Sequence, residues 1–410
     1  MNLKSKLPTK LQKYASFGVI PKLFLLPFAL GFIALILLIR PFVIVKFFKV
    51  NPWRIGHLLV EVEIVRLNAL EASKTKKHFV IYYFPERRLA NRFVAEMWKR
   101  VLPTVTGSLG WQIYEIASLL AKKKLTVTPT IQDVQGLTVQ YKTNWKFTDY
   151  EIAEGHEFLR SVGCHDNNFV CLFVRDSAYL ETIRTDKSFT DYESRNSDIS
   201  TYIQAAEALT ELGYTVFRMG HYVKNSLESA RAKVIDYASN GMRTEFLDVF
   251  LGATCKFCIS TGAGFDNIPQ LFRRPVLYIN VVGFADQMIY SPLLFYPKIY
   301  RDTKTRQLLT FNEIVERGIE NEVHAPEIEA SGTMIENLRP DEITEAVKEM
   351  AARFEGRHIS PTENSMTKNQ ITRFFNTHSK VQHQFITGNV SGEFASCFLS
   401  RYPNFLDGLE

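Results

Sequence analysis

The segment KFCISTGAGFDNIPQLFRRPVLYIN (residues 256–280) decides the fold. Its start, KFCIS, is apolar like a buried strand, DNIPQLF (266–272) has the pattern of a short helix, and PVLYINV (275–281) that of another strand. Between the first strand and the helix, Gly262 and Gly264 let the backbone turn tightly and approach a ligand, and Asp266 can cap the helix. The order strand, glycine turn, helix, strand predicts a parallel sheet with ligand loops at its carboxyl edge.

The chain before this segment continues the same alternation. Residues 168–176 and 214–220 are predicted strands, and residues 201–212 and 244–253 are predicted helices. Gly213 stands where a helix C-cap favours glycine.

A second alternating series lies nearer the N-terminus. FVIVKFFKV (42–50) and HFVIYYF (78–84) are predicted strands, while residues 58–70 and 90–102 have helical spacing. The less regular stretch 126–166 separates the two series. The sequence therefore predicts an α/β protein with two Rossmann-like, doubly wound domains, and the cleft between such domains is the default ligand site.

Positive charge is concentrated at the N-terminus. Nine cations precede the first acidic residue, Glu61, and removing them from the 49 basic residues leaves 40 against 43 acidic ones. A nucleic-acid binder normally carries its basic surplus on a folded domain, so we expect no nucleic-acid partner. The nine are Lys4, Lys6, Lys10, Lys13, Lys22, Arg40, Lys46, Lys49 and Arg54.

The basic region encloses LFLLPFALGFIALILLI (23–39), an uncharged run at the short end of what spans a bilayer. Cations on both sides give no clear orientation and favour a helix lying in an anionic leaflet, with a true span and a buried core helix as alternatives. Five cysteines without a disulfide or zinc pattern indicate reduced thiols. We therefore expect a membrane-surface partner and a place on the cytoplasmic face of the bacterial inner membrane. We also expect that deleting residues 1–39 leaves both domains folded.

Four blocks resemble a family of bacterial glycosyltransferases found among surface-polysaccharide genes. They are RIGHL (54–58), VRDSAYL (174–180), SRNSDISTYIQAAEALTELGYTVFRMG (194–220) and FLDVFLGATCKFCISTGAGFDNIPQLFRRPVLYIN (246–280), and the resemblance covers most of residues 40–354. It implies a GT-B fold and transfer of a sugar from a nucleotide-diphosphate donor to a cell-surface glycan or lipid-linked acceptor. The STGAG turn is also similar to the donor-phosphate turn of heptosyltransferase-like enzymes, without the acidic residue and downstream histidine usual there.

Charge, alternation and resemblance together predict four parts. We expect a membrane-associating segment in residues 1–41, a Rossmann-like acceptor domain in 42–160 and a Rossmann-like nucleotide-sugar domain in 161–355. Residues 356–410 are expected to form a helical tail that returns to the first domain, as the last helix of GT-B enzymes often does.

A GT-B enzyme must stabilise charge on the departing diphosphate, typically with cations and helix N-termini. Arginines near strand ends are candidates, although each could instead be a structural ion-pair partner. The expected donor-binding residues are Arg175, Arg195, Asn196, Arg218, Ser260, Thr261, Gly262, Ala263, Gly264 and Asn280.

The candidate general base is His57, which follows Gly56 in the turn before the first predicted helix of the N-terminal domain. A histidine satisfied by backbone is the alternative reading, and Asp176 and Glu63 are weaker candidates for the base. No Asp-x-Asp motif is present, and His378 and His383 have no Cys or carboxylate ligand near them in the sequence. We therefore expect no metal and no cofactor apart from the donor substrate. Two other classes remain open: a GT-B-like non-glycosyl transferase or epimerase, and an inert membrane-bound glycan assembly protein.

Overall fold

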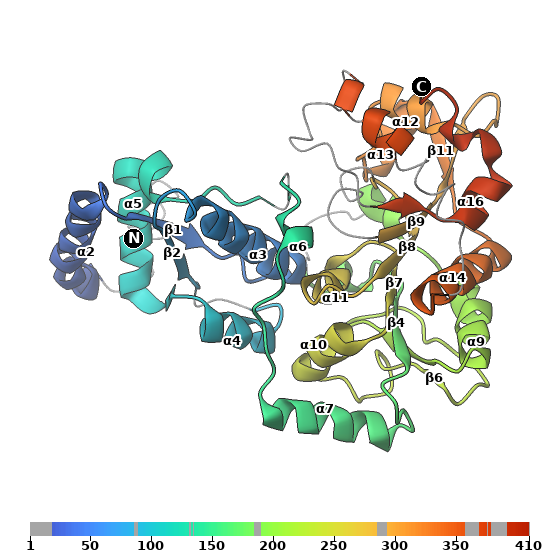
Figure 1. The fold of residues 1–410 in the computed structure, drawn as a ribbon, viewed down its shortest axis with the longest axis horizontal. Coiled ribbons are helices and arrows are strands. Elements are labelled where there is room, and N and C mark those ends of the chain that lie inside the picture. The colour runs from blue at the N-terminus through green and yellow to red at the C-terminus, as the bar shows by residue number, and fades with distance from the viewer. Residues whose placement is uncertain are drawn as a thin grey trace, which may run out of the picture. The chain divides into compact units, whose positions relative to one another are not determined.

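The computed structural model describes residues 19–85, 89–130, 133, 135–183, 190–284, 293–356, 369–374, 376–378 and 392–409. The chain divides into two compact units, Met1–Ile131 and Gln132–Glu410, drawn in blue to teal and in green to red in Figure 1. The predicted alternation of strands and helices is confirmed, and the strands that carry it form parallel sheets.

The second unit is built on a seven-stranded sheet in the order β12-β9-β8-β7-β4-β5-β6, in which every neighbouring pair is parallel. Numbered along this unit, the strands run 3-2-1-4-5-6-7, which is the doubly wound order. The order reverses between β4 and β7, and ligands of doubly wound sheets bind beside the carboxyl ends of those two strands. The strands are β4 (Phe169–Phe173), β5 (Thr215–Met219), β6 (Val234–Ile235), β7 (Cys258–Ser260), β8 (Val276–Val281), β9 (Leu293–Pro297) and β12 (Glu393–Phe394).

Helices and a small two-stranded sheet complete this unit. Strands β10 (Ile299–Asp302) and β11 (Thr333–Glu336) pair antiparallel. The helices are α6 (Leu137–Gln140), α7 (Asp149–Ser161), α8 (Ala178–Ile183), η2 (Thr190–Arg195), η3 (Ile199–Tyr202), α9 (Ile203–Glu211), α10 (Glu245–Thr254), η4 (Gly264–Asp266), α11 (Asn267–Leu271), α12 (Phe311–Glu316), α13 (Ala325–Ala330), α14 (Pro340–Phe354), α16 (Ser396–Arg401) and η7 (Pro403–Leu406).

The boundary between the units lies earlier than the expected 160/161. Helix α7 belongs to the second unit because it packs on α10, where the Phe250 ring lies so close to Gly155 that no Cβ would fit between them. Phe147, just before α7, stacks on Phe272 and meets Phe250 edge-on. These aromatic contacts tie the predicted end of the first domain to the second.

The expected return of the C-terminal tail to the first domain is wrong for its described residues. Strand β12 pairs with β9 of the second unit, and α16 packs on α14. The carboxylate of Glu349 on α14 accepts the amides of Ser396 and Cys397 at 2.8 and 2.9 Å, which caps the start of α16.

The first unit holds a three-stranded parallel sheet in the order β1-β2-β3, formed by β1 (Ile44–Lys49), β2 (His78–Tyr83) and β3 (Thr104–Val105). Thr126 makes a parallel bridge to Phe47 on the free side of β1. The order β3-β2-β1-Thr126 is the first half of a doubly wound sheet. Its helices are α2 (Val19–Ile39), α3 (Ile55–Ala72), α4 (Arg92–Val101) and α5 (Gly107–Leu125).

Helix α2 is part of the core of the first unit. Ala29, Ile33 and Ile36, spaced at one helical face, are at most 3% exposed. They pack in one cluster with Ile113 and Ala117 of α5. The expectation that residues 1–39 can be deleted without harm to either domain is therefore wrong, because the deletion would uncover this cluster.

Within the described residues, no helix combines the length and the apolar character needed to cross a bilayer.

Candidate functional site

The carboxyl ends of β4 and β7 are joined directly. The backbone amide of Arg175, two residues after β4, donates to Oγ1 of Thr261 at 2.8 Å, and the Thr261 amide donates to the carbonyl of Phe173 at 3.2 Å. Two residues that the sequence singled out thus meet where the strand order reverses. This is the position at which doubly wound sheets bind ligands.

Three cations gather at this edge. Arg175 donates from Nη1 to Oδ1 of Asn196 at 2.7 Å, and Nζ of Lys298 donates to the carbonyl of the same Asn196 at 2.7 Å. Arg195, the last residue of η2, donates to the carbonyl of Gly262 at 2.6 Å. Asn196 and the STGAG turn therefore hold the three side chains in one group, which we call the cation cluster (Arg175, Arg195 and Lys298).

Two members of the cation cluster, Arg175 and Lys298, are buried. Arg175 is 9% exposed and Lys298 4% exposed, and in the described part of the chain neither forms an ion pair with a carboxylate. Burial, then repulsion from Arg195, lowers the pKa of Arg175 to about 9, and burial, then repulsion from Arg175, lowers the pKa of Lys298 to about 8. A buried cation that no carboxylate neutralises is costly, and a bound anion lowers that cost.

Lys298 was not predicted, because it follows β9 and lies more than a hundred residues after Arg175 in the chain. Its signal in the sequence is weak: one lysine directly after an apolar strand, at the edge where the other candidates converge.

Two amides of the STGAG turn, those of Gly262 and Ala263, are bonded to neighbouring side chains. Oδ2 of Asp266 accepts the Ser260 hydroxyl at 3.0 Å and the Ala263 amide at 2.9 Å, while the Ser260 hydroxyl accepts the Gly262 amide at 3.1 Å. Burial, partly offset by these bonds, raises the pKa of Asp266 to about 6. Ser260 and Ala263 therefore maintain the turn.

The helix N-terminus at which a diphosphate was expected follows this turn directly. The helix after the turn is interrupted, because η4 has three residues and α11 five. Gly264 opens η4, and its carbonyl accepts from Asn267 at 3.2 Å. Gly262, with φ of +79°, has the left-handed backbone that glycine tolerates, and its carbonyl holds Arg195. The turn thus acts through the arginine that it positions.

Two residues that were predicted to bind the nucleotide-sugar donor, Arg218 and Asn280, make structural contacts. Arg218 is fully buried within β5, where it pairs with Asp236 at 3.0 Å and donates to the Asn225 carbonyl at 3.1 Å. Asn280, 1% exposed, donates to the hydroxyl of Tyr202 at 2.9 Å and accepts the Leu338 amide at 2.7 Å. The hydrogen bonds of both side chains lie within the protein, although Nε of Arg218 is buried without a partner among the described residues.

Asp176 also has a structural environment. Its two oxygens accept the amides of Ala178 at 2.9 Å and Lys224 at 2.8 Å, so the carboxylate fixes two loops. Both carboxylate oxygens of Asp176 are therefore occupied by backbone amides.

His57 lies in the first unit, in the first turn of α3, with a carboxylate partner. Its Nδ1 is 2.6 Å from Oε1 of Glu61, and the imidazole is 29% exposed whereas Glu61 is buried. The carboxylate places the proton on Nδ1, which leaves Nε2 as the acceptor. Glu63, the weaker candidate, is buried and paired with Arg66 at 2.8 Å. The i, i+4 spacing of His57 and Glu61 was the sequence signal for this pair.

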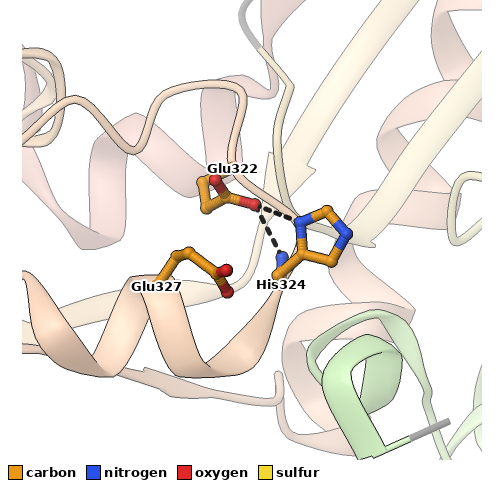
Figure 2. A group of neighbouring side chains, drawn as sticks. All are labelled: Glu322, His324 and Glu327. Carbon is orange, nitrogen blue, oxygen red and sulfur yellow. Dashed lines mark hydrogen bonds and ion pairs between the residues drawn. The ribbon is translucent and has the colours of Figure 1, made fainter.

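A group that the sequence did not indicate adjoins the cation cluster. Figure 2 shows Glu322, His324 and Glu327, whose ligand atoms all lie within 4.8 Å of one another. Ser194 of η2 donates to the Val323 carbonyl at 2.5 Å, and the ring of Tyr192 lies 4.8 Å from that of His324. The three could hold a divalent cation.

Glu322 already has partners without a metal. Its Oε1 accepts the His324 ring at 2.7 Å and the amides of Val323 and His324 at 2.8 and 2.9 Å. Burial would raise the pKa of Glu322, but these bonds hold it below its usual range. His378 pairs with Glu316 at 2.8 Å, and His383 lies outside the described residues.

The second unit is thus a doubly wound α/β unit with three cations gathered at the carboxyl edge of its sheet. No protein-family model matches the chain, and no curated protein matches it.

Two solved structures are similar to parts of the chain. One is the bacterial iron-containing dodecameric glycosyltransferase TibC from enterotoxigenic E. coli H10407, with 13% identity and a TM-score of 0.30 over 60% of this chain and 59% of that one. The other is a glycosyl transferase family 9 protein from Veillonella parvula DSM 2008, with 11% identity and a TM-score of 0.29. That similarity covers 72% of this chain and 80% of the family 9 protein. The chain thus spans about three fifths of TibC. These scores are too low to establish a shared fold, so what the site does must follow from its own residues.

Proposed function

We propose that the chain is a metal-independent glycosyltransferase of the GT-B type that uses a nucleotide-diphosphate sugar and a glycan or lipid-linked acceptor. The observation that carries this proposal is the pair of buried cations, Arg175 and Lys298, which form no ion pair with a carboxylate among the described residues. Asn196 joins the two beside the point where the strand order reverses. A diphosphate is the leaving group whose charge such a cluster suits.

The roles follow from the chemistry. The bond between the anomeric carbon and the diphosphate oxygen breaks, and its electron pair leaves with the nucleoside diphosphate, where the cation cluster stabilises the charge. The acceptor oxygen forms the new bond to the anomeric carbon and gives its proton to Nε2 of His57. Glu61, bonded to Nδ1, holds the ring and stabilises the imidazolium.

A panel of nucleotide sugars tests the proposal. Thermal shift of the full chain should identify the donor that binds, and adding a lipid-linked or glycan acceptor should then release the nucleoside diphosphate. Release of another product would favour a non-glycosyl transferase or an epimerase. Acceptor binding without any nucleotide binding would favour an inert assembly protein.

Affinity for a nucleoside diphosphate is expected to fall as the pH rises above about 8. The free protein loses the Lys298 proton around that pH, whereas the bound anion favours the protonated form. The dissociation constant should rise by up to about tenfold per pH unit in this range. Titration calorimetry at several pH values measures it. Lys298→Met should flatten the pH dependence of the dissociation constant, whereas the exposed control Lys304→Met should leave it unchanged. If Lys298→Met keeps the parental pH dependence, Lys298 is not the group that titrates.

Turnover is expected to survive chelation with EDTA, because the cation cluster takes the place of a metal at the diphosphate. The measurement is initial rate before and after chelator. Complete loss that magnesium or manganese restores would overturn this expectation. The variant His324→Ala would then show whether Glu322, His324 and Glu327 hold the metal.

A further inference from the structure

Over residues 25–39, the part of α2 whose side chains are described, the outward face is apolar. Ala29, Ile33 and Ile36 point into the core of the first unit, while the rest of the described helix exposes large apolar side chains. Phe28 is 62% exposed and Leu38 is 74% exposed. The others are Leu26, Leu30, Phe32, Leu35 and Leu37, with Phe42 just beyond the helix. Exposed apolar surface of this extent marks an interaction site.

The tip of α5 extends this face with both apolar and basic residues. Nη1 of Arg40, just after α2, donates to the carbonyl of Lys124 at 2.9 Å, so the carboxyl ends of α2 and α5 lie together. Figure 1 shows the two helices packed along each other. Leu119 and Leu120 of α5 are 71% and 64% exposed, and the exposed run Lys122–Lys124 follows them.

We propose that this surface, formed by the outward face of α2, Leu119, Leu120, Arg40 and Lys122–Lys124, docks onto an anionic lipid bilayer with α2 lying in the plane of the leaflet. The buried stripe of α2 keeps that helix on the domain, and its opposite face enters the boundary between headgroups and acyl chains. Arg40 and the three lysines then lie among the headgroups.

Charge complementarity favours lipid over a second copy of the chain. The residues from 1 to 60 contain no acidic side chain, and Glu115, the acidic residue of α5, is 3.5 Å from Lys49. A symmetric contact would place this surface against its own copy, and residues 1–60 of that copy offer no carboxylate to neutralise Arg40 and Lys122–Lys124. Anionic headgroups neutralise those cations, at about 1 kcal/mol for each residue near the surface.

Vesicle flotation of the full chain tests the proposal. The protein should float with vesicles of phosphatidylcholine containing one third phosphatidylglycerol, and less with phosphatidylcholine alone. The variant K122E/K123E/K124E should bind on the order of 100-fold more weakly to the anionic vesicles. The control K142E/K146E/K304E makes the same change of charge at exposed sites of the second unit and should bind like the parent.

A second variant probes the apolar part. L119S/L120S changes exposed side chains, so the first unit should fold normally. The vesicle binding that remains at high salt should decrease in this variant, because it depends on apolar contact. Parental binding by both variants would overturn the proposal. So would dimerisation of the parent that L119S/L120S abolishes while vesicle binding persists. Nucleoside-diphosphate binding is measured in the same samples. Its loss or retention tests the proposed function separately from membrane docking.

Discussion

Arg175→Ala is expected to weaken nucleoside-diphosphate binding by about 10-fold to 100-fold, because a charge-assisted bond to the anion contributes roughly 1.5–3 kcal/mol. Turnover should fall further, by about 10²-fold to 10³-fold, since charge on the diphosphate is greatest in the transition state. Calorimetry measures the first effect and release of the diphosphate the second. Arg175→Lys should recover only part of the affinity, because the lysine keeps the charge but loses the fork of donors.

A matched control exists at the opposite edge of the same sheet. Arg274 precedes β8 and donates from Nε to the Ala253 carbonyl at 2.7 Å, so it too is an arginine held by backbone. Arg274→Ala should bind the diphosphate like the parent. Equal binding by the Arg175 and Arg274 variants would remove the donor site from the edge between β4 and β7.

Stability separates a binding arginine from a structural one. Arg175→Ala should change the free energy of unfolding by no more than about 2 kcal/mol, because lost hydrogen bonds are offset by relief of repulsion with Arg195 and Lys298. Arg218→Ala should destabilise by about 3–5 kcal/mol, because it breaks a buried ion pair. Chemical denaturation distinguishes the two.

His57→Ala is expected to lower turnover by about 10²-fold to 10⁴-fold, the usual contribution of a general base. Binding of the nucleoside diphosphate should stay at the parental level, because the cation cluster belongs to the other unit. Glu61→Gln should lower turnover less, since the base remains but the imidazolium loses its carboxylate. Single-turnover kinetics with saturating donor measures both variants.

His78 provides the control. It lies in the same unit at the start of β2, and its Nδ1 meets the Lys76 carbonyl at 2.7 Å. His78→Ala should keep parental turnover. A His57→Ala protein that is folded, binds donor and turns over normally would show that the base lies elsewhere.

The fold was predictable because its strands are buried and its helices follow at regular intervals. Burial makes β4 and β8 continuous apolar runs, and Gly262 marks the turn that joins a strand to a helix. The boundary between the units was not predictable, because in the sequence Phe147 and Gly155 look like residues of a connecting segment. Only the structure shows that both contact Phe250 of the second unit.

The site was only partly predictable for a related reason. Sequence position shows that a residue is near a strand end, but it does not show whether the side chain faces the edge or the interior. Arg218 therefore looked like Arg175 although it faces Asp236 inside the sheet layer. The link between Arg175 and Lys298 depends on tertiary structure, since both meet at Asn196 from distant parts of the chain.

The packing of α2 against α5 sets an order of events during synthesis. Ile33 leaves the ribosome about eighty residues before its partner Ile113, which corresponds to several seconds at the usual rates of translation. Throughout that interval the inward face of the nascent helix lacks its partner α5. Under the docking that we propose, a bilayer near the exit tunnel shields the helix during this time, so membrane binding and folding of the first unit become a single coupled step.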